Sequence, residues 1–75
     1  MQENKIIIRT FGSVPKRIAL YCIDKVIDSV DTWVGKECGF TFTQNNNTIV
    51  VVGTKNKNSI TFLCYYEQEK RKEML

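Results

Sequence analysis

The sequence predicts a small α+β domain of the order β-α-β-β-β, in which one helix packs on one face of a four-stranded mixed sheet. Two observations lead to this prediction. Four segments are rich in the β-branched and aromatic residues that favour strands. A single segment shows the three- and four-residue apolar spacing of an amphipathic helix. The chain has 75 residues, and we expect residues 1–75 to form a single domain.

The first two elements are a strand and the helix. We expect residues 5–11 to form the strand and residues 14–34 to form the helix, with Pro15 in the first turn, where its missing N–H costs nothing. Gly35 is suited to end the helix. The apolar positions of the helix form one stripe that we expect to cover the sheet. They are Ala19, Cys22, Ile23, Val26, Ile27, Val30, Trp33 and Val34.

Three further strands follow, and turns join them. We expect strands at residues 40–43, 48–52 and 59–66, then a charged tail or short helix at 67–75. The first turn is centred on Asn45–Asn46, because asparagine adopts left-handed conformations readily. A strand, a returning helix and another strand imply a parallel pair with a right-handed crossover.

Each strand carries apolar side chains on both faces. Loops of even length centred on Asn45–Asn46 and on Lys55–Asn56 assign one set of residues to the helix side. That set is Phe40, Phe42, Ile49, Val51, Ile60, Phe62 and Cys64. The opposite face then carries Thr41, Thr43, Val50, Val52, Thr61, Leu63 and Tyr65, with Ile7 and Arg9 from the first strand. Because one helix covers only one face of a small sheet, the second apolar face is expected to meet a partner.

Composition argues against several kinds of site. The chain has no histidine, and its three cysteines, Cys22, Cys38 and Cys64, lack C-x-x-C spacing, so we expect neither a metal nor a cofactor. Residues 1–5 are polar, which is unlike a signal peptide, and no stretch approaches the roughly 18 apolar residues of a membrane span. We therefore expect a cytoplasmic protein with reduced thiols that does not contact a membrane.

Catalytic chemistry is also poorly represented. Nucleophilic and acid–base catalysis need a nucleophile, a base and a group that orients the base. Without histidine the base would have to be a carboxylate, lysine or tyrosine, and the candidate nucleophile is the thiol of Cys38. The carboxylates of Asp24, Asp28 and Asp31 share one side of the helix, where they could bind a divalent cation or a basic partner. Helical spacing places the three carboxylates on the wet side of the helix, and no base accompanies Cys38. We expect a protein that is not an enzyme.

The uncovered face predicts a protein-binding module that self-associates, most simply as a homodimer. We expect the interface to comprise Ile7, Val50, Val52, Leu63 and Tyr65. An apolar, threonine-rich face is typical of a contact between proteins. Small size without catalytic residues also suits a regulator or inhibitor, and small proteins of mobile elements are a class of that kind.

The alternative is an RNA- or DNA-binding module. The net charge is +3, and phosphates would contact Arg9, Lys16, Arg17, Lys55 and Lys57, with Tyr65 stacking on bases. The segment 12–17 could also hold an anion, since it combines a helix N-terminus with two basic residues. The sequence lacks the aromatic-glycine signature of an RNA-recognition sheet.

Overall fold

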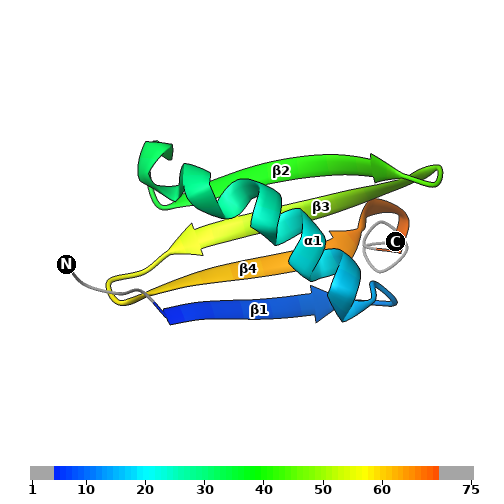
Figure 1. Ribbon diagram of the computed structural model, residues 1–75, viewed down its shortest axis with the longest axis horizontal. Coiled ribbons are helices and arrows are strands. Elements are labelled where there is room, and N and C mark those ends of the chain that lie inside the picture. The colour runs from blue at the N-terminus through cyan, green and yellow to red at the C-terminus, as the bar shows by residue number, and fades with distance from the viewer. Residues whose placement is uncertain (1–4, 70–75) are drawn as a thin grey trace.

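A four-stranded sheet with one main helix on one face forms the described part of the chain, residues 5–69, in the computed structural model (Figure 1). The predicted fold class is confirmed. The elements are β1 (Lys5–Phe11), α1 (Lys16–Val26), the 3-10 helix η1 (Ile27–Thr32), β2 (Glu37–Gln44), β3 (Asn47–Lys55) and β4 (Ser59–Tyr66). Of the predicted tail at 67–75, residues 67–69 form a helical turn, and 70–75 lie outside the described residues.

The strands lie in the order β1-β4-β3-β2. β1 pairs with β4 in parallel, whereas the β4–β3 and β3–β2 pairs are antiparallel. The crossover between the parallel strands includes α1, which runs obliquely over one face of the sheet (Figure 1). This topology leaves β1 and β2 as the two edge strands.

The helix differs from the prediction at both ends. It begins at Lys16 with Pro15 as N-cap, and the Pro15 carbonyl accepts hydrogen bonds from the Ile18 and Ala19 amides at 3.0 and 3.1 Å. The α-helix ends at Val26 rather than continuing to residue 34. Beyond it the chain tightens into η1, where the Ser29 hydroxyl donates to the Val26 carbonyl at 2.6 Å. Such side-chain bonds to the backbone compete with the regular helical ladder.

The end of the predicted apolar stripe is wrong as well. Val34 was expected on the helix face that covers the sheet, but its side chain is 97% exposed. Trp33 is buried as expected, although its backbone is extended (φ −66°, ψ 136°) rather than helical. Two residues outside the predicted stripe belong to the core region instead. Val14 is buried in the core, and Ile18 is partly buried against the core.

The two hairpin turns fix the register. Asn45 and Asn46 both have positive φ, 50° and 67°, and join β2 to β3 as a two-residue loop of the type that matches strand twist. The β3–β4 turn is centred on Lys57–Asn58 rather than Lys55–Asn56, with the Asn56 amide donating to the Ser59 carbonyl at 2.8 Å. Each residue of β3 therefore pairs with a residue of β4 that lies four positions later in the sequence than the predicted partner. Because that shift is even, the predicted faces are unchanged.

Gly53 extends β3 beyond its predicted end. The sequence suggests a turn residue, yet Gly53 is buried within the strand and pairs with Phe62 and Cys38. The Trp33 ring packs directly over it, and the same ring contacts Phe40 and Phe62 with centroids 5.9 and 6.0 Å apart. A glycine is needed here because a larger residue would overlap with the indole.

The core lies between α1, η1 and the sheet. The predicted set is confirmed: Ile49, Val51, Ile60, Phe62 and Cys64 are buried, and Phe40 and Phe42 are partly buried against them. Among residues 5–69, both helices lie on this side of the sheet, and neither covers the other face.

Candidate functional site

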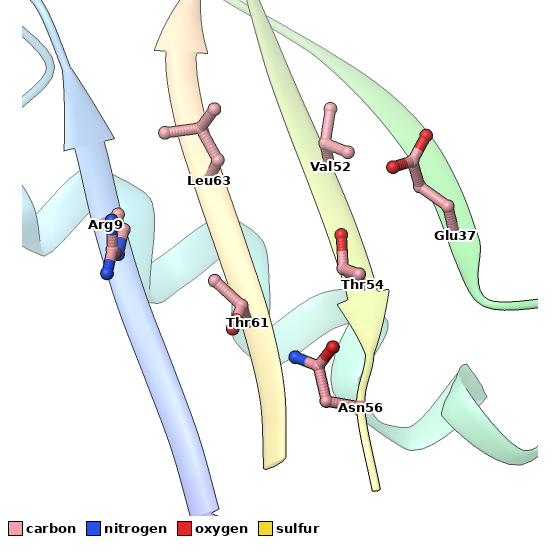
Figure 2. A pocket seen from close by; sticks show the side chains of 7 residues that line it. All are labelled: Arg9, Glu37, Val52, Thr54, Asn56, Thr61 and Leu63. Carbon is pink, nitrogen blue, oxygen red and sulfur yellow. The ribbon is translucent and has the colours of Figure 1, made fainter.

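The sheet face opposite α1 is built from alternate residues of all four strands, and we call it the outer face. The strand register arranges most of its side chains in three rows that cross all four strands. The first row is Ile7–Thr61–Thr54–Glu37, the middle row is Arg9–Leu63–Val52–Gly39, and the third row is Phe11–Tyr65–Val50–Thr41. In the part of this face that Figure 2 shows, no helix or loop of residues 5–69 lies in front of the strands.

All five residues predicted to form the protein interface lie on the outer face. Val52 pairs with Leu63, and Val50 pairs with Tyr65, so these four side chains are direct neighbours. Ile7 lies at one edge, opposite Thr61. Every one of the five side chains is partly exposed, although their neighbours in the sheet cover part of each. The register thus gathers four of them into one apolar surface over β3 and β4, and Ile7 lies at its edge beyond Thr61.

A broad, shallow depression of about 510 Å³ lies at the centre of the outer face. Figure 2 shows the seven side chains that line it: Arg9, Glu37, Val52, Thr54, Asn56, Thr61 and Leu63. Its centre is apolar, and threonine hydroxyls border it. Arg9 and Glu37 stand at its opposite edges, on β1 and β2. An apolar centre with polar and charged groups at the rim is the usual layout of a protein interface.

Glu37, Thr54 and Asn56 are additions to the predicted site. They were missed because the predicted strands stop short of them. Alternation along the chain could have revealed Glu37, which lies four residues before Thr41 and therefore on the same face of an extended strand. Thr54 follows Val52 by the same rule.

The five basic residues predicted to bind nucleic acid are not brought together. Lys16 and Arg17 are exposed at the start of α1, at the end of the sheet opposite to the β3–β4 turn that carries Lys57 (Figure 1). Lys55 lies on the helix side, and its Nζ donates to the Val30 carbonyl at 3.4 Å. Arg9 is the only one of the five basic residues on the outer face.

The predicted anion site at 12–17 already holds a carboxylate from the same chain. The Ser13 amide donates to Glu69 Oε2 at 2.9 Å, and the Ser13 hydroxyl donates to Glu69 Oε1. Gly12 has a φ of +73°, and a Cβ at this position would overlap with the Glu69 carboxylate. An external anion would have to displace Glu69 to use these donors.

The thiols offer little reactivity. All three cysteines are free, and burial raises the pKa of Cys22. Burial, with a smaller contribution from the nearby Cys22, raises the pKa of Cys64 to about 11. Both side chains are therefore thiols at neutral pH, whereas nucleophiles and metal ligands need the thiolate. Cys38 is partly exposed on β2.

Within residues 5–69, no group of three or more histidine, cysteine, aspartate or glutamate side chains is arranged to hold a metal ion. Asp24, Asp28 and Asp31 are exposed, as expected for the wet side of the helix. The same part of the chain contains no helix with the length and apolar character needed to cross a membrane. Comparisons with protein-family models, curated proteins and solved structures found no match to this chain.

Proposed function

We propose that the protein is a non-enzymatic protein-binding module whose outer face packs against the outer face of a second copy. One observation supports this most strongly. Val50, Val52, Leu63 and Tyr65 form a continuous apolar surface that no part of residues 5–69 covers. Small proteins seldom leave such a surface in water, because its burial is favourable by roughly 25 cal/mol per Å².

The size of the outer face suits a weak dimer. Strands lie about 4.8 Å apart and rise about 3.3 Å per residue, so four strands of eight residues cover roughly 500 Å² in projection. Two such faces bury about 1,000 Å² together, near the lower limit of specific interfaces. We therefore expect a dissociation constant in the micromolar range and an exchange between monomer and dimer.

The charge distribution favours protein over nucleic acid as the partner. A nucleic-acid surface needs several cations along one groove or face. The cations of the outer face are Lys5 and Arg9, both on the edge strand β1, and Glu37 opposes Arg9 across the depression. A module of this kind would act by occupying a surface of its partner, which suits a regulatory or inhibitory role.

Sedimentation velocity over a range of concentrations tests the proposal. The wild-type chain should change from monomer to dimer as its concentration rises. Leu63→Lys should remain monomeric, because association would bury an ammonium at the centre of the contact. Leu20→Lys is the matched control: Leu20 is 44% exposed on the helix, away from the outer face, and this variant should associate like the wild type.

Circular dichroism checks that each variant is folded. If Leu63→Lys unfolds, Val50→Thr with Val52→Thr supplies a milder change, since threonine keeps the shape and strand preference of valine. A wild-type chain that stays monomeric at every concentration would contradict the proposal. So would a dimer that both outer-face variants leave intact. Co-sedimentation of the monomer with RNA or DNA would favour the alternative function.

A further inference from the structure

The two charges beside the depression cannot neutralise each other within one chain. Arg9 is on β1 and Glu37 is on β2, and these are the two edge strands of the sheet. Three inter-strand spacings and two residues along the strands separate the Cα atoms of Arg9 and Glu37, about 16 Å in total. Both side chains are exposed, and neither forms an ion pair with another of the described residues. The outer face is therefore positive along one edge of the depression and negative along the other.

Gly39 is a glycine that the single chain does not require. It lies within β2 in the middle row, and its φ is not in the left-handed region. A Cβ placed on it would meet nothing within 4 Å, unlike one placed on Gly53. Glycine weakens a strand and often marks a place where another chain approaches closely. In Figure 2 the Glu37 carboxylate is drawn beside Val52, the residue that pairs with Gly39.

Two simple twofold arrangements of the stacked faces differ in which strands meet. A twofold axis parallel to the strands, between β3 and β4, places β1 over β2 of the partner and β4 over β3 of the partner, with each row lying over itself. A twofold axis across the strands instead places β1 over β1 and β2 over β2. The first arrangement brings opposite charges together, whereas the second gathers two arginines along one edge and two glutamates along the other. Juxtaposed like charges disfavour the second arrangement.

We propose that two copies stack their outer faces about a twofold axis parallel to the strands, so that Arg9 passes over Gly39 of the partner subunit and pairs with Glu37 of the partner subunit. This inference rests on the proposed self-association and adds its orientation. Stacked sheets lie about 10 Å apart, and two residues along a strand span about 6.6 Å, so the paired Cα atoms lie roughly 12 Å apart. Extended arginine and glutamate side chains bridge that separation.

The same operation sets the centre of the contact. Leu63 lies over Val52 of the partner subunit, and Tyr65 lies over Val50 of the partner subunit. The apolar residues provide the burial, while two symmetric ion pairs at the rim select one orientation of the partner. The absence of a side chain at Gly39 leaves space for the arginine that crosses it.

Charge reversal in one chain and in mixtures tests this arrangement. Arg9→Glu and Glu37→Arg each replace both ion pairs by like charges, so each variant alone should self-associate about tenfold more weakly than the wild type. An equimolar mixture of the two variants should form a heterodimer of wild-type affinity, because each contact then joins opposite charges. The double variant in one chain should also recover wild-type affinity. Gly39→Leu should weaken association while the chain stays folded.

The matched controls are Lys57→Glu and Asp24→Arg, which make the same changes in net charge at exposed positions away from the outer face. Alone and mixed, they should associate like the wild type. A wild-type dimer that neither Arg9→Glu nor Glu37→Arg weakens would overturn this orientation and leave the proposed function standing. Recovery in the double variant but not in the mixture would overturn it too. A wild-type chain that never associates would refute the proposed function itself.

Discussion

Adding a single methyl group to Gly53 should destabilise the fold, because the Trp33 ring occupies the space that a side chain would need. A Cβ on Gly53 would overlap with Cη2 of Trp33 and lie only 2.9 and 3.0 Å from Cζ3 and Cζ2. The indole is 8% exposed and packs against Phe40 and Phe62, and its Nε1 donates to the Ser29 hydroxyl at 3.0 Å. The ring is therefore fixed from several sides.

The magnitude follows from the cost of overpacking a core, typically about 1–3 kcal/mol. We expect Gly53→Ala to lose about 2 kcal/mol of unfolding free energy. For a domain of this size, that corresponds to a fall in melting temperature of roughly 10 °C. The loss is a large fraction of the total stability that a chain of 75 residues can have.

Thermal and urea denaturation followed by circular dichroism measure this loss. They should be run at a concentration at which the chain is monomeric, since association adds apparent stability. Gly39→Ala is the matched control, because its new methyl group meets nothing within 4 Å, and it should be neutral or slightly stabilising. Equal melting temperatures for Gly53→Ala and Gly39→Ala would refute the packing argument. Trp33→Leu replaces the indole by a smaller side chain. In that background, Gly53→Ala should lose less unfolding free energy than it does in the wild type.

Three further predictions concern the core, a thiol and a turn. Phe62 is fully buried, so Phe62→Ala should lose about 3–5 kcal/mol of unfolding free energy, and a denaturation assay should find much of the variant unfolded. An unchanged melting curve would mean that the two faces of the sheet are reversed. Because the pKa of Cys64 is about 11 when folded against an ordinary value of 9.0, the unfolded chain loses this proton first, and stability should fall as pH rises above 9. This fall should be smaller in Cys64→Ala, and an equal fall in both chains would contradict it. Asn46 has a φ of 67°, so Asn46→Val should destabilise the hairpin by about 1–2 kcal/mol whereas Asn46→Gly should not, a difference visible in the melting temperatures.

Local patterns were sufficient to predict most of the fold. β1 and β4 have the predicted bounds, because Gly12 and the polar turn before Ser59 interrupt runs of β-branched and aromatic residues. The faces also follow from local evidence. The side-chain period of a strand is two, so any even loop gives the same faces even when its centre is misplaced. The β3–β4 turn shows this directly, since its centre is two residues later than predicted.

The remaining features depend on contacts between distant parts of the chain. β3 continues to Lys55, where the Lys55 amide donates to the Lys36 carbonyl at 2.6 Å, and no local signal predicts that contact. Gly53 resembles a turn residue until the Trp33 ring is placed over it. Helical periodicity continues past Val26, but it does not show that the Ser29 hydroxyl will bond to the backbone there.

The candidate site was predictable only in part. The apolar residues of the outer face follow from alternation, whereas the grouping of charges depends on strand order. That order places Arg9 and Glu37 on opposite edges. Lys55 lies on the helix side because it follows Val51 by four residues in a strand that is longer than predicted. Alternation places Gly39 with Thr41 on the outer face and Gly53 with Val51 on the helix side, but it does not show that the Trp33 ring lies over Gly53.

Isotope-filtered nuclear Overhauser spectroscopy tests the central claim, packing of one outer face on another, most directly. A sample that mixes labelled and unlabelled chains at a concentration where dimer predominates reports only contacts between different copies. We predict intermolecular signals from the methyl groups of Val50, Val52 and Leu63, including Leu63 to Val52 of the partner subunit. Intermolecular signals confined to exposed helix-side residues such as Leu20 and Val34 would contradict the account.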